Sequence, residues 1–236
     1  MHSAAGACYS LRMAKRAPKP PAKRRPKPRA TYHHGRLREA LLEAAERMIE
    51  EQGPETVTVR EAARRAGVSP GAPFRHFASR TALMTGVAER AMKRFLAEIA
   101  RAEAAVDPDD AGARYAALGR AYLRWALRHP AQFRVLATRS GIDFDASESL
   151  PRDNDAIRAL MQDIVADGQK RGQIRAADPA TLELAAKALS YGLARMYVDG
   201  QFPQWGVAQS EAEAAMQRVL DLFLELLTIG PRPAEG

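Results

Sequence analysis

The feature that most constrains this chain is a pair of helix-start signals separated by a tight turn. Thr58 is followed three residues later by Glu61, and in such a pair each side chain can satisfy a free backbone amide of the first helical turn. Gly67 ends this first helix, and Ser69 followed by Pro70 is a typical start for another one. The spacing therefore predicts a helix, a three-residue turn and a second short helix, which is the arrangement of a helix-turn-helix that reads DNA.

The second helix of this motif contains an internal proline. With Ser69 as its cap, Pro73 is the fourth helical residue and forfeits only the first intrahelical hydrogen bond. We therefore expect a helix of roughly two turns that ends near Phe77. The side chains of Val68 and Phe77 are expected to lie in the core.

Apolar side chains recur at helical spacing through most of the remaining chain, which predicts an all-α fold. A first helix starts near Arg36, and Gly53 followed by Pro54 ends it. Beyond the helix-turn-helix, the expected helices cover 80–104, 108–128, 154–171, 179–199 and 210–228, with a polar loop over 139–153.

The positive charge of the chain is concentrated near its start. The net charge is +8, but residues 1–36 hold ten Lys and Arg and no acid, which leaves 26 basic and 28 acidic side chains elsewhere. We expect a disordered, basic, proline-rich tail over 1–30, a DNA-binding domain over 31–80 and a larger helical domain over 81–230. The tail can follow DNA phosphates or enter a minor groove, or it can be a solvated leader without a role, with Met13 as an alternative start.

Several classes of protein are not expected. Cys8 is the only cysteine, which excludes a disulfide framework and fits a reducing, cytoplasmic compartment. No apolar run approaches ~20 residues and no secretory signal is present, so no membrane partner is expected. His33 and His34 stand without a further metal-binding cluster, and no catalytic set or phosphate-binding glycine loop is found. We therefore expect no metal, no cofactor and no enzymatic activity.

The stretch TVTVREAARRAGVSPGAPFRHF, residues 56–77, resembles the DNA-binding domain of TetR-type transcriptional regulators. Ser79, Arg80 and Leu83 continue this likeness, which covers about residues 35–90. A weaker likeness, carried by Ser-Tyr-Gly at 190–192, is to a subgroup with a Trp-His-Gly signature. The resemblance implies three N-terminal helices that bind DNA, followed by a larger helical domain that binds a ligand and dimerises.

One part of the motif departs from the family pattern. Many members carry Thr-Leu-Tyr where this chain has Ala72, Pro73 and Phe74. Phe74 keeps the ring but lacks the hydroxyl that often bonds a phosphate. Ala72 presents a methyl group that can touch a thymine methyl.

The resemblance and the geometry of a helix-turn-helix together predict the DNA contacts. Phosphate contacts set the register of a protein on DNA, and base contacts set its specificity. Arg60 is the candidate for a two-bond contact to guanine, whereas Thr58 and Arg80 are candidates for phosphate contacts. The expected reading tip is Ser69, Pro70, Gly71 and Ala72, and the expected flanking contacts are Phe74, Arg75, His76, Tyr32 and His33.

The larger domain is expected to hold a ligand and a second copy of the chain. Small side chains at 185, 188 and 192, and an apolar arc in the last helix wider than one face, predict a homodimer through the last two helices; a deeply buried last helix is the alternative. Residues expected to line an effector pocket are Trp125, Phe133, Met161, Tyr191 and Met196, and ordinary core is the alternative for each. Sparse charge along these helices predicts an apolar or weakly polar small-molecule effector.

The leading hypothesis is a sequence-specific repressor that binds a palindromic double-stranded operator as a dimer and is released by the effector. The alternative is a nonspecific nucleic-acid-binding protein driven by the basic tail. Residues 37–80 hold seven basic and seven acidic side chains, so this domain is not strongly basic by itself. Its affinity for DNA then depends on where the charges lie, on dimerisation and on the tail.

Overall fold

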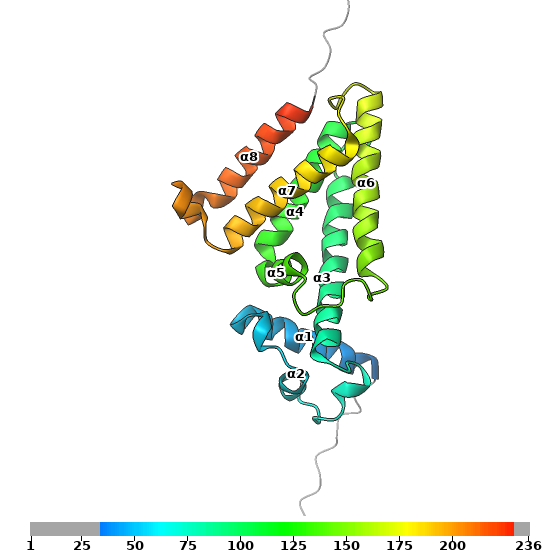
Figure 1. Cartoon of the computed structure of the whole chain (residues 1–236), viewed down its shortest axis with the longest axis vertical. Coiled ribbons are helices and arrows are strands. Elements are labelled where there is room, and N and C mark those ends of the chain that lie inside the picture. The colour runs from blue at the N-terminus through cyan, green and yellow to red at the C-terminus, as the bar shows by residue number, and fades with distance from the viewer. Residues whose placement is uncertain (1–33, 229–236) are drawn as a thin grey trace, which may run out of the picture. The chain divides into compact units, whose positions relative to one another are not determined.

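The computed structural model describes residues 34–228, and its regular elements are helices (Figure 1). The all-α prediction is confirmed for these residues, whereas the predicted tail, Tyr32 and His33 lie outside them. An isolated bridge joins Ile174 to Thr228. The helices are α1 (His34–Gln52), η1 (Pro54–Thr56), α2 (Val59–Arg65), η2 (Pro73–Arg75), α3 (Arg80–Glu103), α4 (Ala111–Arg128), α5 (Pro130–Thr138), α6 (Leu150–Lys170), α7 (Pro179–Val198), η3 (Phe202–Trp205), η4 (Gln209–Glu211) and α8 (Ala212–Leu227).

The first core is formed by α1, α2 and the first turns of α3. Leu41 and Met48 from α1 and Leu83 from α3 are completely buried, as the helical spacing of the apolar residues predicts. The small side chains of Ala62 and Ala63 face the same core, which lets α2 pack closely on α1. These contacts hold the helix-turn-helix in one orientation on α1 and α3.

The second helix of the helix-turn-helix differs from the prediction. After α2 the chain makes a turn in which the Ala72 amide donates to the Ser69 carbonyl at 3.1 Å, and only then forms the short 3-10 helix η2. The predicted α-helix of roughly two turns is therefore wrong. The cause lies in Pro70, Gly71 and Pro73: Pro73 has no amide to donate to Ser69, and glycine weakens any helix that contains it.

The boundaries in the larger region differ at two places. The turn after α3 is longer than predicted because the Asp107 carboxylate accepts the Asp109 amide at 2.9 Å, and α4 starts after Asp110, whose side chain caps the Ala113 amide at 2.8 Å. The predicted loop over 139–153 is shorter, since α6 already begins at Leu150. Helix α5, which begins with Pro130 in its first turn, was not predicted because the proline was interpreted only as the end of α4.

Helix α3 belongs to both halves of the described chain. Its first turns lie in the core with α1 and α2, and its later residues Met92, Phe95 and Ile99 line a cavity among α4 to α8. Ion pairs along its length, such as Arg94 with Glu46 at 3.1 Å, connect it to α1. A change at the cavity can therefore reach the helix-turn-helix through one continuous helix.

Candidate DNA-binding surface and ligand cavity

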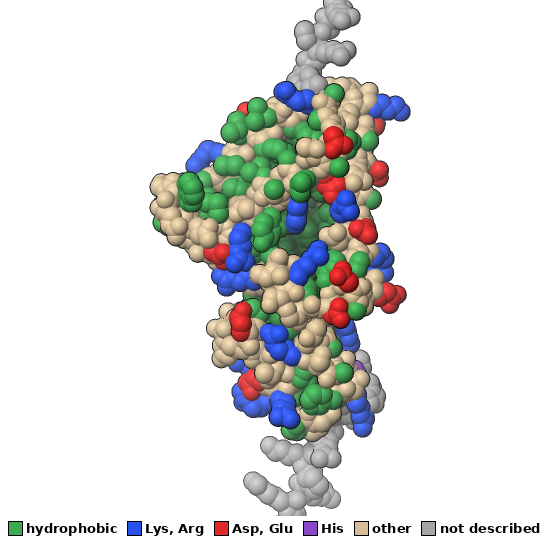
Figure 2. Space-filling model, in the orientation of Figure 1, with side chains coloured by type: hydrophobic (Ala, Val, Ile, Leu, Met, Phe, Trp, Pro, Cys, Tyr) green, Lys and Arg blue, Asp and Glu red, His purple; other side chains and the backbone are tan. Residues whose placement is uncertain are grey.

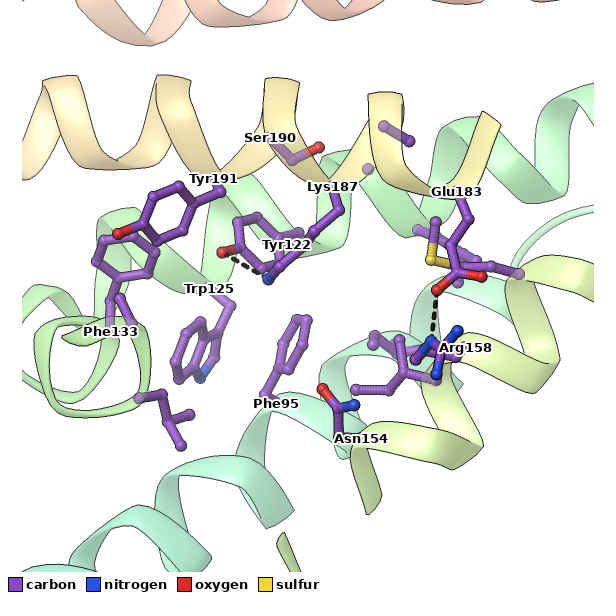
Figure 3. A pocket seen from close by; sticks show the side chains of 18 of the residues that line it. Phe95, Tyr122, Trp125, Phe133, Asn154, Arg158, Glu183, Lys187, Ser190 and Tyr191 are labelled. Atoms are coloured by element: carbon purple, nitrogen blue, oxygen red, sulfur yellow. Dashed lines mark hydrogen bonds and ion pairs between the residues drawn. The ribbon is translucent and has the colours of Figure 1, made fainter. Parts of the chain in front are cut away.

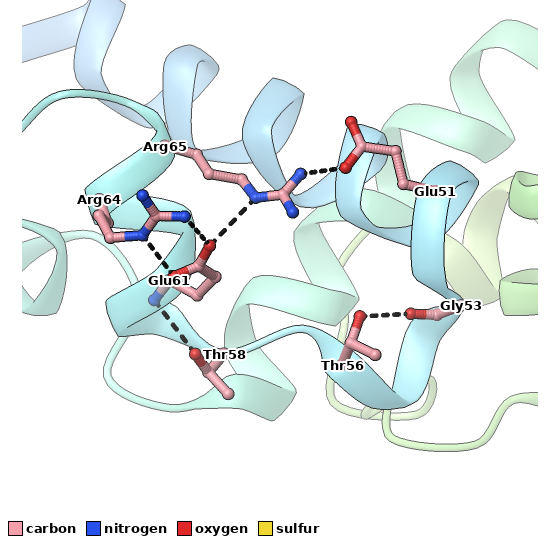
Figure 4. Close-up of polar contacts among 7 residues, drawn as sticks. All are labelled: Glu51, Gly53, Thr56, Thr58, Glu61, Arg64 and Arg65. Atoms are coloured by element: carbon pink, nitrogen blue, oxygen red, sulfur yellow. Dashed lines mark hydrogen bonds and ion pairs between the residues drawn. The ribbon is translucent and has the colours of Figure 1, made fainter.

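Thr58 begins α2 as predicted. Its hydroxyl oxygen accepts the Glu61 backbone amide at 3.1 Å, which satisfies one of the free amides at the helix start. The reciprocal half of the predicted capping box is absent, because the Glu61 carboxylate turns toward two arginines (Figure 4). The remaining first-turn amides of α2 are thus left for another acceptor, and a DNA phosphate is one.

The charges of α2 divide into a paired group, which Figure 4 draws, and a free one. Glu61 accepts from Arg64 at 2.6 Å and from Arg65 at 3.2 Å, and Arg65 also reaches Glu51 at 2.5 Å. Hydrogen bonds from Arg64, and then from Arg65, lower the pKa of Glu61 to about 2. Arg60 is exposed on the same helix and forms no ion pair with any residue in 34–228, so its guanidinium is available for a base.

The predicted reading tip is open to solvent. Ser69, Pro70 and Gly71 are exposed, Ala72 is half-buried, and the Ser69 hydroxyl forms no hydrogen bond within the described part of the chain. Pro73 is buried, and η2 contacts both α1 and α2. The tip is therefore a small-residue turn carried by a buried proline, and its backbone can approach base edges closely.

The side chains after the tip point in two directions. Phe74 is 47% exposed, an unusual position for a large apolar ring, and Arg75 beside it is exposed as well. His76 is half-buried, and Phe77 is 3% exposed within the first core. Phe74 and Arg75 are thus exposed directly after the tip, whereas Phe77 is anchored in the first core.

Arg80 is used inside the protein. Its guanidinium donates to the Val57 carbonyl at 3.0 Å and to the Pro54 carbonyl at 2.7 Å, so it joins the start of α3 to the segment before α2. The Pro54 carbonyl also accepts the Val57 amide at 3.3 Å, so Arg80 adds a charged donor to a carbonyl that η1 already uses. Two of the Arg80 donors are thus used within the protein, and its phosphate contact stays a prediction.

Replacing Arg80 with Met separates these two roles. We expect Arg80→Met to lower the free energy of unfolding by about 2–3 kcal/mol, because it leaves two carbonyls without a charged donor. Thermal denaturation without DNA measures this loss. If Arg80 instead contacts a phosphate, the substitution leaves stability unchanged. The slope of log affinity against log salt concentration then falls by about 1.

A cavity of about 380 Å³ lies among α3, α4, α5, α6, α7 and α8. Its apolar wall is a chain of aromatic rings: Phe95 lies 4.9 Å from Trp125 and 5.4 Å from Tyr122, and Phe133 lies 6.1 Å from Tyr191, measured between ring centroids (Figure 3). Small-molecule pockets in proteins begin at about 300 Å³ and are mostly apolar with a few polar groups. The cavity meets both criteria.

Four of the five predicted pocket residues line this cavity: Trp125, Phe133, Met161 and Tyr191. Met196 does not line it and instead packs against the core farther along α7. Phe95, Tyr122 and Lys187 also line the cavity and were not predicted. The two rings follow the apolar stripes of α3 and α4, but periodicity alone does not distinguish a cavity wall from filled core.

The polar groups of the cavity form two clusters (Figure 3). Glu183 accepts from Arg158 at 2.6 Å and from Gln162 at 2.7 Å; although desolvation by itself raises the pKa of Glu183, these hydrogen bonds lower it overall. Lys187, one turn farther along α7, donates from Nζ to the Tyr122 hydroxyl at 3.3 Å and lies 4.6 Å from the centroid of that ring. Desolvation and the charge of Arg139 lower the pKa of Lys187.

The outer faces of α7 and α8 are apolar. Hydrophobic side chains gather over these two helices in Figure 2, where few charges interrupt them. Leu184 on α7 is 69% exposed, and Leu222 and Leu226 on α8 are 57% and 61% exposed. The other side of α8 is buried through Ala215, Met216, Leu220 and Leu224. The wide apolar arc of the last helix therefore serves an inner core and an outer surface.

Two negative findings apply to the described part of the chain. No helix between residues 34 and 228 is long and apolar enough to cross a membrane. Within the same residues, no cluster of three or more His, Cys, Asp or Glu side chains is placed to hold a metal ion.

Comparisons with known proteins agree with this geometry. A family model described as "Bacterial regulatory proteins, tetR family" matches residues 41–87, and one described as "Tetracyclin repressor-like, C-terminal domain" matches residues 115–227. A search of curated proteins gives no match.

Solved structures resemble nearly the whole chain. A protein of unknown function from Rhodococcus sp. RHA1 is 31% identical, with 85% of this chain and 100% of that chain covered and a TM-score of 0.72. A regulatory protein in the tetR family from Rhodococcus RHA1 is 20% identical, with 82% and 98% covered and a TM-score of 0.65. The ketosteroid transcriptional regulator KstR2 of Mycobacterium tuberculosis is 21% identical, with 82% and 95% covered and a TM-score of 0.60. The last two show likeness of fold alone.

Proposed function

Because the chain belongs to the tetR family of bacterial regulatory proteins, we propose that it is a homodimeric repressor that a small molecule releases from a palindromic operator. Regulation of transcription follows from the family. We propose in addition that the protein represses transcription, that its operator is a palindrome and that a ligand releases it from DNA. The observation that carries it is the cavity on α3, the helix whose first turns lie in the core of the helix-turn-helix.

The DNA contacts of each subunit centre on two exposed groups of side chains. Arg60 binds a guanine through two hydrogen bonds, and the turn at 69–72 approaches the neighbouring base edges. Phe74 contributes an apolar contact to a thymine methyl or a sugar, and Arg75 contacts a phosphate. This assignment is supported by the exposure of Arg60, Phe74 and Arg75, and by the absence of an ion pair for either arginine within the described residues.

The Arg60 contact makes a specific prediction. We expect Arg60→Ala to relax base preference at one position of the half-site by about 1–3 kcal/mol, because one two-bond guanine contact is lost. Affinities for operators with each base at that position measure the effect. Lys93→Ala removes one exposed charge from α3 outside the DNA-binding surface and serves as the control. Equal losses on every sequence would contradict a base contact and indicate a phosphate contact instead.

The homodimer is proposed to form through the outer faces of α7 and α8. Contiguous apolar surface on a water-soluble chain marks an interaction site, and a second copy offers the same surface across a two-fold axis. Such a dimer carries two helix-turn-helices, which a palindromic operator matches. The DNA-binding domain of one subunit is nearly neutral, so we expect it to bind DNA weakly by itself. Two domains that bind the same operator together supply the missing affinity.

Ligand release is proposed to act through α3. A ligand in the cavity contacts Met92, Phe95 and Ile99, and α3 carries any displacement to Leu83 and the first core. A ligand shifts the equilibrium only by its difference in affinity between the DNA-bound and released forms. The aromatic wall on α3 provides contacts that can differ between those forms.

Selection of bound sequences from random DNA tests the proposed function. A dimeric repressor returns two inverted half-sites, about 10 base pairs or a multiple of this apart. Deleting residues 1–30 should keep the same half-site and lower only the salt-sensitive affinity. A nonspecific binder driven by the tail returns no motif and loses binding on deletion.

A further inference from the structure

The unpaired charges that line the cavity are positive. Lys187 and Arg139 both line it, and neither forms an ion pair with an acid among residues 34–228. The acid that lines it, Glu183, is already bonded to Arg158 and Gln162. The carboxylate charge in the cavity is thus neutralised, whereas two positive charges are not.

Lys187 is held in a position that suits an anion. Its Nζ lies 4.6 Å and 5.9 Å from the ring centroids of Tyr122 and Tyr191, and its one side-chain hydrogen bond in the described structure goes to the Tyr122 hydroxyl (Figure 3). An ammonium has three donors, so two remain for a ligand. Arg139 repels it, and an anion between them relieves that repulsion.

Trp125 supplies an independent observation. Its side chain is 2% exposed and lines the cavity, and its Nε1–H has no hydrogen-bond partner within the described structure. A buried donor without a partner is costly and rare, so an acceptor on a ligand is the natural partner. The Lys187 ammonium and the unpartnered Trp125 Nε1–H therefore both favour a ligand that accepts hydrogen bonds.

We infer that the ligand of this cavity is an apolar organic acid, with its carboxylate held by Lys187 near Arg139 and its apolar body against Phe95 and Phe133. The inference rests on the proposed function, in which the cavity is the effector site. It narrows the effector from an apolar or weakly polar molecule to an amphipathic anion. A small, fully polar anion does not fit this cavity. It has no apolar surface to bury against the aromatic rings, so its binding gains no hydrophobic free energy.

Matched acid and alcohol pairs test the charge requirement on the full-length protein. The pairs are 1-naphthaleneacetate with 1-naphthaleneethanol, and decanoate with 1-decanol, titrated by calorimetry. We expect at least one acid to bind about tenfold to a hundredfold more tightly than its alcohol, which is the value of a charge-assisted hydrogen bond. Lys187→Met keeps the length of the stem and removes the charge, so it should abolish this preference and leave the affinity for the alcohol nearly unchanged.

Lys93→Met, which removes an exposed lysine from α3 outside the cavity, is the matched control and should keep the preference. Alcohols that bind as tightly as acids to the unmodified protein, or a preference that survives Lys187→Met, would overturn the inference and leave the effector cavity standing. Failure of both acids and both alcohols to bind would contradict the cavity as an effector site, and with it this part of the proposed function.

Discussion

Placing glutamate at both Leu222 and Leu226 is expected to convert the protein to a monomer and to weaken operator binding at least a hundredfold. Both side chains are more than half exposed in the single chain, so the substitutions leave its fold intact. In a dimer formed through α7 and α8 they bury two unpaired carboxylates per subunit, and each costs several kcal/mol. Analytical ultracentrifugation measures the assembly, and titration of the selected operator measures the affinity.

A control adds the same charges to another helix. Ala159 and Ala166 are exposed on α6, outside the apolar face of α7 and α8, and seven residues separate them on one side of that helix. The double variant Ala159→Glu/Ala166→Glu should remain a dimer and bind the operator normally. A dimer that survives the changes at Leu222 and Leu226, or dissociates on those in α6, would place the interface elsewhere.

The fold was predicted best where a local signal determines it. Thr58 caps α2, and Gly53 followed by Pro54 ends α1, because each of these depends on a few neighbouring residues. The second helix of the motif was not predicted correctly, since two prolines and a glycine act together there. Only one half of the capping box forms, the hydrogen bond from the Glu61 amide to Thr58. The Glu61 carboxylate binds Arg64 and Arg65 instead of the Thr58 amide.

The sites depend on contacts between distant parts of the chain, which spacing does not reveal. Arg80 looked like a phosphate ligand at a helix start, and only the folded chain brings the Val57 and Pro54 carbonyls to it. Trp125 and Phe133 are buried and line the cavity, but the empty space beside them arises from the packing of six helices. Lys187 carries a signal that was not used: it is a cation between Ala186 and Ala188 in an apolar stretch of α7.

Phe77→Ala is expected to lower the free energy of unfolding by about 3–5 kcal/mol and to abolish operator binding. The Phe77 ring is 3% exposed, lies beneath the Arg38 guanidinium at 5.5 Å and fills the space beside Gly86, where even a Cβ would meet it at 3.0 Å. Its loss leaves a void between α1, α3 and the reading tip. Circular dichroism melting should show a fall in Tm of roughly 6–20 °C.

Replacing Phe74 with alanine, in contrast, should change DNA binding and leave stability unchanged. Phe74 is 47% exposed, so Phe74→Ala should leave Tm unchanged and weaken operator binding about tenfold, the value of one groove contact. Phe74→Tyr restores the hydroxyl that the family often carries there and should strengthen binding through a phosphate, with a steeper salt dependence. A fall in Tm with Phe74→Ala, or normal binding by it, would mean that the ring packs within the protein. The exposed turn would then read DNA without it.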